Sequence, residues 1–515
     1  MFESKISRSK KVILFTLLII LNIVLRIPSI PHEKGADSFF IHSLANSITT
    51  FGHANWWLHW LSAFGYYPYS YASAIPFSLS GISQATGIEL EYTILIFCII
   101  IGLFSIFSAY ILAGVIYDDF LFKYLMALFY STSPSIMFFS TWEISTRGPL
   151  NIFLPVYLYL IMGHIQNTKR LLLLSITGIF LFSIHHIAIV LVPITSLYIV
   201  IKLLSKTKIK IKPTQLNYAY LAGVVVAFAF PFFNPTMTGI TGSRYSYVFQ
   251  SMTIITRYIG PMMAFAFSGL IYLALRNDKK IDLWYILVLV IFFIPFMYNQ
   301  TYGIHMFQLF IVIILTVGFR NLLNSRNMKS PKIIGLAIII ILVSSVMFSA
   351  FYNHQRTGKY QAFWYMDDKT KLTGEWISDN INKDKKVLFS SENYYRVRAL
   401  ALQKNGTGIL TGGTEALTYG FIDKDLLLLK NLEKVPFTDS YYYSEAHYRT
   451  TEKVDEYESI HWYLAYKGIK KIKDVYDLDY LVQSISYPEP IGYNENKREK
   501  IYSDGLLEIY DLRSV

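Results

Sequence analysis

The sequence predicts a polytopic α-helical membrane protein with a C-terminal α/β domain outside the membrane. Of its 515 residues, 53% are hydrophobic and only 16% are charged, and the mean hydropathy is +0.37. A soluble chain of this length would need more charge to cover its surface. The apolar residues also gather in runs of about 20 residues, which is the length that a helix needs to cross a bilayer.

We predict about eleven membrane spans in the first two-thirds of the chain. They cover residues 12–30, 92–116, 121–138, 150–164, 170–184, 186–204, 216–233, 254–275, 283–298, 302–319 and 332–352. The fifth and sixth spans share one apolar tract, interrupted only by His185 and His186. The first span has a long apolar core with no small-residue cleavage site after it, so we expect a membrane helix and not a signal peptide.

Basic residues are concentrated in alternate loops, which orients the chain. Lys and Arg precede the first span and follow the second, fourth, sixth, eighth and tenth, whereas the other loops are nearly free of cations. This positive-inside pattern predicts a cytoplasmic N-terminus. With an odd number of spans in the cell membrane, the residues from about 353 onward are extracytoplasmic. The net charge of +12 is therefore explained by membrane orientation, and we expect no nucleic-acid partner.

The composition changes after the last span and divides the chain into a transmembrane domain, residues 1–352, and an extracytoplasmic domain, residues 353–515. In the second domain we predict short buried strands, helices and a final edge strand. The expected strands are 386–390 and 480–483, the helices 372–381 and 453–467, and the edge strand 505–511. The single cysteine, Cys98, lies inside the second span, so disulfides play no part.

Scarce polar and ionisable residues at the outward ends of the spans all fall on one face of the membrane. Such groups are costly near hydrocarbon and usually serve a function. They are Glu33, Asp37 and His42 in the first outer loop, Glu143 and Arg147 in the second, His185 and His186 at the third turn, Arg244 and Arg257 by the fourth, and Asn299 and His305 at the fifth. In an enzyme or a transporter these residues should face one shared cavity.

Each of these residues also has a structural alternative. Asp37 suits the N-cap of a helix that begins at Ser38, and the spacing of Glu143 and Arg147 allows them to pair with each other. The adjacent histidines fit a helix break or hydrogen-bonded interior positions, and the arginines by the fourth outer turn fit interfacial anchors. We favour a functional Asp37, because only Glu33 is another carboxylate so near the first span. P-loop, GxGxxG, HExxH and CxxC motifs are absent, so nucleotide and zinc chemistry have no support.

This layout resembles the GT-C superfamily of membrane glycosyltransferases, which includes polyprenyl-phosphate-sugar transferases, protein mannosyltransferases and the oligosaccharyltransferase catalytic subunit. The closest likeness lies in residues 35–42 (GADSFFIH), and residues 143–148 (EISTRG) are similar to the second acidic motif of the oligosaccharyltransferase branch. The paired acidic motif of many members is loosened here to Glu33 and Asp37. The Trp-Trp-Asp-Tyr-Gly motif with which oligosaccharyltransferases read their acceptor is absent from residues 353–515. This absence favours transfer of a single sugar over transfer of a whole oligosaccharide.

The resemblance implies a donor sugar on a polyprenyl (dolichyl) phosphate, met at the outer leaflet among membrane lipids. The acceptor would be a glycan, a lipid-linked glycan or a protein. Asp37 is the expected general base, which takes the proton of the acceptor hydroxyl. The expected cations near the departing phosphate are Arg147, Arg244, Arg257 and the histidine pair.

The chemistry needs no cofactor in principle, since the phosphate leaving group is already on the donor. If Asp37 and Glu143 converge, Mg²⁺ or Mn²⁺ between them is an alternative. Glu33, His42 and His305 are expected to contact the substrate. Three rival functions stay open: an oligosaccharyltransferase-like enzyme, a carrier of lipid-linked saccharides, and a non-catalytic assembly subunit. A carrier would need polar groups at mid-membrane depth, which the spans nearly lack.

Overall fold

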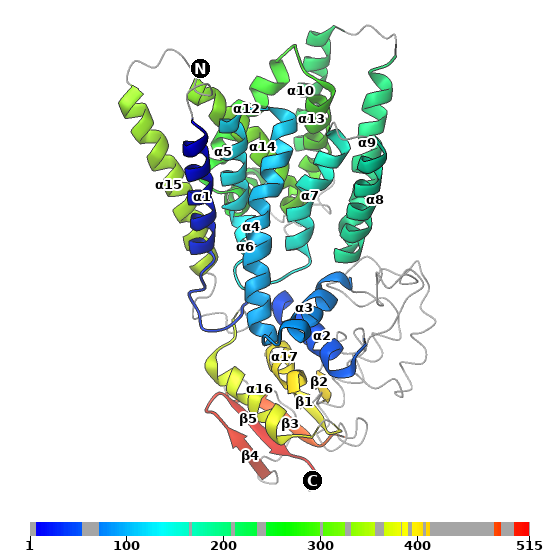
Figure 1. Ribbon diagram of the computed structural model, residues 1–515, viewed down its shortest axis with the longest axis vertical. Helices are drawn as coiled ribbons and strands as arrows, with labels where there is room; N and C mark the ends of the chain where they lie inside the picture. The colour runs from blue at the N-terminus through cyan, green and yellow to red at the C-terminus, as the bar shows by residue number, and fades with distance from the viewer. Residues whose placement is uncertain are drawn as a thin grey trace.

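The computed structural model describes most of the chain as a helical bundle joined to a small sheet domain. The described residues are 7–53, 72–163, 167–207, 212–233, 244–298, 302–324, 331–355, 365–382, 384–389, 394–404, 408–411, 478–485 and 499–513. The sheet domain lies at one end of the bundle, with α2 (Ala36–Phe51) and α3 (Ala74–Thr86) between the two (Figure 1). The chain enters this junction from α1 (Arg8–Leu25), and the end of the connecting segment, at Glu33 and Lys34, is buried there.

Helices lie within every one of the eleven predicted spans. After α1 they are α4 (Leu90–Ile116), α5 (Phe120–Ser131), α6 (Pro134–Phe138), α7 (Arg147–Met162), α8 (Asn167–Ile184), η3 (His186–Val190), α9 (Leu191–Leu204), α10 (Pro213–Phe233), α11 (Arg244–Ile259), η5 (Pro261–Met263), α12 (Ala264–Leu275), α13 (Ile281–Phe293), η6 (Ile294–Tyr298), α14 (Gly303–Asn324) and α15 (Pro331–Gln355). By length and composition, four helical stretches of the described chain can cross a membrane, or five with one bent pair. The helical, membrane-type fold is therefore confirmed, while eleven crossings stay a prediction.

Two of the predicted spans are interrupted. The span expected over 121–138 ends at α5 and restarts as the short α6, with Pro134 in its first turn. The span expected over 254–275 bends by 117° between α11 and α12. At this bend Gly260 has a φ of +95° and is followed by Pro261, which has no amide proton to continue the helical hydrogen bonds. Hydropathy averaged over a whole span does not register either break, because it measures composition and not backbone geometry.

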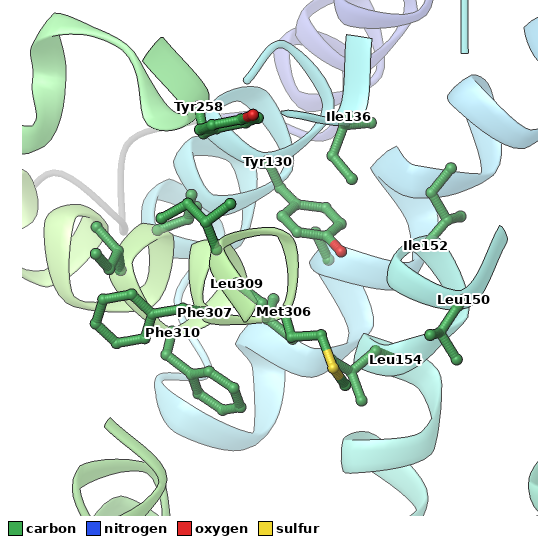
Figure 2. Packing of buried hydrophobic residues seen from close by; sticks show 14 of the residues in the cluster. Tyr130, Ile136, Leu150, Ile152, Leu154, Tyr258, Met306, Phe307, Leu309 and Phe310 are labelled. Atoms are coloured by element: carbon green, nitrogen blue, oxygen red, sulfur yellow. The ribbon is translucent and has the colours of Figure 1, made fainter. Parts of the chain in front are cut away.

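Helix α14 runs through the centre of the bundle and fixes its neighbours. Figure 2 shows its Met306 and Phe310 packed among buried side chains that include Tyr130 of α5. Against α12 the backbones touch, since a Cβ added to Gly269 or Gly318 would collide with main-chain atoms of the opposite helix. The close contact with α12 lies in the second half of α14, at Ile314 and Gly318, while α14 also packs against α5 and α7. These contacts fix the helix that carries His305 near its start.

The C-terminal domain is a mixed five-stranded sheet with two helices. Its elements are α16 (Asp368–Asn380), β1 (Lys386–Phe389), α17 (Tyr394–Lys404), β2 (Gly408–Thr411), β3 (Tyr480–Ser484), β4 (Glu499–Ser503) and β5 (Leu507–Asp511). The strand order is β2-β1-β3-β5-β4, with β1 parallel to β2 and β3, and β5 antiparallel to β3 and β4. The strands predicted at 386–390 and 480–483 and the helix at 372–381 are confirmed. The helix predicted at 453–467 lies outside the described residues.

The prediction of an edge strand at 505–511 is wrong. Strand β5 is an interior strand with partners on both sides, β3 and β4. Its alternating burial shows that one face packs on the core, through Leu507 and Ile509. Alternation reports how many faces are buried and not how many edges are paired, so it fits an interior antiparallel strand equally well.

The C-terminal domain rests on α2, the helix that carries Asp37. Helix α17 packs along α2, and Phe39 of α2 forms a small apolar cluster with Met366 and Leu400. The Met366 amide donates to the Glu33 carbonyl at 3.0 Å. The helix behind the predicted catalytic residue is thus covered by the C-terminal domain.

Candidate functional site

Asp37 lies at the N-terminal end of α2 and faces the loop before α7. The helix begins at Ala36 with Gly35 as its N-cap, and this cap makes no side-chain hydrogen bond, so Asp37 is not the N-cap. Its Oδ2 accepts a hydrogen bond from Ser145 Oγ at 2.9 Å and pairs with the Arg147 guanidinium. The Asp37 side chain is 39% exposed. The carboxylate is therefore positioned by two donors and is still open to a substrate.

Arg147 joins this carboxylate to an aromatic cluster. It is the first residue of α7, and its Nε donates to Ser145 Oγ at 3.2 Å. The guanidinium lies over the rings of Phe139 and Tyr302, at 5.3 and 5.6 Å from their centroids. Stacking on two rings holds a planar cation in one orientation. Arg147 therefore presents a fixed positive charge next to Asp37.

His185 reaches the same cluster from the break between α8 and η3. Its ring lies edge-on to Tyr302 with centroids 5.4 Å apart. Its Nδ1 accepts the Ile187 amide at 3.0 Å, which caps the following 3₁₀ turn. The histidine is buried and lies at the break between two helices, so both structural alternatives for it, a helix break and a hydrogen-bonded interior position, are observed. A role of His185 in substrate binding stays a prediction.

His305, near the start of α14, closes the cluster on the other side. Its Nδ1 lies 2.5 Å from Ser135 Oγ, and its ring contacts Phe139 and Tyr258 with centroids 4.9 and 4.8 Å away. Beyond it, the guanidinium of Arg257 lies 5.6 Å from the Tyr258 ring. A continuous series of contacts thus leads from Asp37 through Arg147 and His305 to Arg257. His185 joins this series at Tyr302.

Glu143 lies directly behind the turn that precedes α2. It is buried, and a Cβ added to Gly35 would come within 2.5 Å of the Glu143 Cγ. Only a glycine lets this carboxyl group approach so closely. Asp37 and Glu143 therefore belong to facing segments of the chain, as the predicted metal site requires.

The described donor atoms do not by themselves build a metal site. Within the described ranges no group of three or more His, Cys, Asp or Glu side chains is placed to hold an ion. A hard divalent cation needs about six oxygen ligands, and the Asp37 carboxylate is already engaged by Arg147 and Ser145. Binding of Mg²⁺ or Mn²⁺ between Asp37 and Glu143 stays a prediction, and the reaction proposed below has no step through a metal.

Glu33 and His42 lie behind Asp37 and are fully buried. The Glu33 Oε1 is 2.7 Å from His42 Nδ1, and its Oε2 accepts from Ser38 Oγ at 3.2 Å. The Ser38 hydroxyl in turn accepts the Ile144 amide at 3.2 Å. Burial by itself lowers the pKa of His42, but the Glu33 carboxylate outweighs burial and raises this pKa above its ordinary value. The pair links α2 to the loop that carries Ser145.

The other predicted residues cannot be placed in the cluster. His186 begins η3 and Arg244 begins α11, but their side chains lie outside the described part of the chain, as does Asn299. Sequence reasoning missed Phe139 and Tyr302, the two rings that bring the predicted residues together. Aromatic residues make up 17% of this chain, so no sequence signal singles out these two.

The chain has the GT-C fold of membrane glycosyltransferases. No protein-family model matches it and no curated protein sequence matches it significantly, so the likeness is one of structure. The apo oligosaccharyltransferase of Archaeoglobus fulgidus aligns with a TM-score of 0.58 at 13% identity, over 94% of this chain and 71% of that one. The archaeal enzyme AglB of the same organism, in complex with an inhibitory peptide and a dolichol-phosphate, gives 0.53 at 12% identity, over 93% and 69%. ArnT from Cupriavidus metallidurans, bound to undecaprenyl phosphate, gives 0.57 at 10% identity over 98% of both chains.

Proposed function

We propose that this chain is an integral membrane glycosyltransferase that moves a sugar from a polyprenyl (dolichyl) phosphate to a glycan, lipid-linked glycan or protein acceptor at the outer face of the cell membrane. The observation that carries the proposal is the part-exposed Asp37 carboxylate beside the Arg147 guanidinium, at the end of an apolar helical bundle with the GT-C fold. The structures of similar fold that hold dolichol-phosphate and undecaprenyl phosphate support a lipid-phosphate donor.

The two charged groups suit the two ends of the reaction. Asp37 takes the proton of the acceptor hydroxyl while the acceptor oxygen forms the new bond to the anomeric carbon of the donor sugar. The bond from this carbon to the lipid phosphate breaks, and the phosphate leaves with the electron pair. Arg147 donates to the phosphate oxygens, where negative charge develops. The proton then passes from Asp37 to solvent, which restores the carboxylate.

The test is mass spectrometry of surface glycans and lipid-linked saccharides from a strain that lacks this protein. The strain is rescued with the wild type, with Asp37→Asn, or with Asp118→Asn as a matched control. Asp118 is an exposed aspartate in the loop between α4 and α5, away from the site, where it pairs with Lys123 of α5. Loss of a general base lowers the rate by about 10²–10⁴-fold.

We expect glycans that lack one sugar, with rescue by the wild type and by Asp118→Asn but not by Asp37→Asn. Loss of a whole oligosaccharide instead of one sugar would point to the oligosaccharyltransferase-like alternative. Full rescue by Asp37→Asn would overturn the catalytic role of Asp37 and leave a carrier or an assembly subunit as the better hypothesis.

A further inference from the structure

We propose that Glu91 is a positioning residue that couples docking of the C-terminal domain against the helical bundle to the geometry of Asp37 and Arg147. The inference rests on the proposed function for its effect on the reaction, but the contacts that support it are independent of the substrate. Glu91 lies in the first turn of α4, and its side chain is only 1% exposed. None of the sequence patterns singles it out.

The Glu91 carboxylate makes three contacts with two separate parts of the molecule. Its Oε1 lies 3.0 Å from His32 Nδ1 and accepts the Glu33 amide at 3.2 Å. Its Oε2 accepts from Lys371 Nζ of α16 at 3.2 Å. A buried carboxylate is costly unless charged and polar partners surround it. Here the C-terminal domain supplies the lysine and the segment after α1 supplies the other two donors.

His32 adds a second connection between the same parts. Its Nε2 lies 3.1 Å from Asp368 Oδ1, also on α16, while its Nδ1 contacts Glu91. The hydrogen bond to Glu91 raises the pKa of His32, against the effect of burial. Proximity to Glu91 likewise outweighs burial and raises the pKa of Lys371. Both partners are therefore favoured in their charged forms, which an ion-paired junction requires.

From Glu91 a short series of hydrogen bonds leads to Asp37. Glu91 holds the Glu33 amide, and the Glu33 carboxylate accepts from Ser38 Oγ at 3.2 Å. The Ser38 hydroxyl accepts the amide of Ile144 at 3.2 Å. The next residue along the chain is Ser145, whose Oγ donates to Asp37 Oδ2 at 2.9 Å. Each link is a directional contact between buried or part-buried groups, so displacement at Glu91 is passed on to Asp37.

If the C-terminal domain moved away from the helical bundle, Lys371 and Asp368 would move with it. Glu91 would then keep only His32 as a charged partner. Because an underpaired buried carboxylate is unfavourable, the segment at Glu33 would rearrange together with it. The coupling is reciprocal, so a fixed position of the Asp37 side chain also favours docking of the C-terminal domain. An acceptor that contacts the C-terminal domain can thereby influence the catalytic pair without touching it.

The test compares two lysine-to-methionine variants on the same helix. Lys371→Met removes the partner of Glu91 but keeps most of the side-chain length, whereas Lys369→Met changes an exposed lysine two residues away. Amide hydrogen exchange of the full-length protein in detergent reports on residues 33–38 and 144–147. We expect exchange in both segments to be about tenfold faster in Lys371→Met and unchanged in Lys369→Met.

Sugar transfer from a polyprenyl-phosphate-linked sugar gives the second readout. In Lys371→Met we expect kcat to fall about 10- to 100-fold, as small displacements of catalytic groups do, with the KM for the lipid donor unchanged. Glu91→Gln should reproduce both effects from the bundle side. A failure of Glu91→Gln to fold would leave Lys371→Met as the deciding variant.

The two readouts separate this inference from the proposed function. Unchanged exchange at 144–147 in Lys371→Met would overturn the coupling, whatever the activity. Faster exchange with unchanged kcat would overturn its importance for the reaction. If the wild type transfers no sugar from such a donor, the proposed function fails, while faster exchange in Lys371→Met alone would still support the coupling.

Discussion

Replacement of Gly35 by alanine perturbs the turn that delivers Asp37 to the site. Gly35 has a φ of +92° and a ψ of 133°, a region that side-chain-bearing residues avoid at a cost of order 1–3 kcal/mol. An added Cβ would also lie 2.5 Å from Glu143 Cγ and 2.6 Å from its Oε1, closer than carbon atoms pack. The buried Glu143 has to move or the start of α2 has to turn, and either displaces Asp37.

The other end of α2 provides a matched control. Gly52, its C-cap, also has a positive φ, +73°, but a Cβ there would meet nothing within 4 Å. Gly52→Ala should thus be destabilised only by the backbone strain of the positive φ, about 1–2 kcal/mol. We expect both variants to unfold at a slightly lower temperature when they are heated at the same rate in detergent. Only Gly35→Ala should lose sugar transfer, by about 10²-fold if Asp37 shifts by about 1 Å.

The comparison of the two variants decides the matter. If Gly35→Ala transfers sugar as fast as Gly52→Ala, the close contact between Gly35 and Glu143 does not fix the catalytic carboxylate. The reasoning about this turn would then be refuted, even if Asp37 itself proved essential.

Two further predictions concern charge. Arg147→Lys keeps the positive charge but loses the flat contact with Phe139 and Tyr302, so we expect about tenfold slower sugar transfer; an unchanged rate would mean that charge alone suffices. The raised pKa of His42 stabilises the fold at pH below the ordinary histidine value of about 6.5, and this contribution is lost as the pH rises through the raised pKa. The unfolding temperature of the wild type should therefore fall as the pH rises through the raised pKa of His42. It should fall less in His42→Gln, because glutamine cannot become charged beside Glu33. Parallel curves of unfolding temperature against pH for the two proteins would contradict this account.

Much of the helical framework was predictable from the sequence, for a simple physical reason. A helix that faces lipid must satisfy its own hydrogen bonds and be apolar along its length, so each span leaves a local record in the chain. Every predicted span contains a helix, and the strands at 386–390 and 480–483 also lie where expected. The breaks at Pro134 and Gly260 escaped prediction because hydropathy does not register backbone geometry.

The candidate site was predicted as a set of residues but not as an arrangement. The scarcity of ionisable groups near the spans pointed to Asp37, Arg147, His185 and His305, because such groups are costly there without a purpose. The aromatic ring of Tyr302 that joins two of them could not be foreseen among so many aromatic residues.

The sequence by itself thus determined the membrane-type helices and the short list of polar residues at their ends. Only the tertiary structure decided that Asp37 pairs with Arg147, 110 residues away, and that Glu91 joins the bundle to the C-terminal domain. Partners so distant in the chain meet through the packing of whole helices, and no local pattern records that packing. Hydropathy is a property of each segment, whereas the site is a property of how the segments meet.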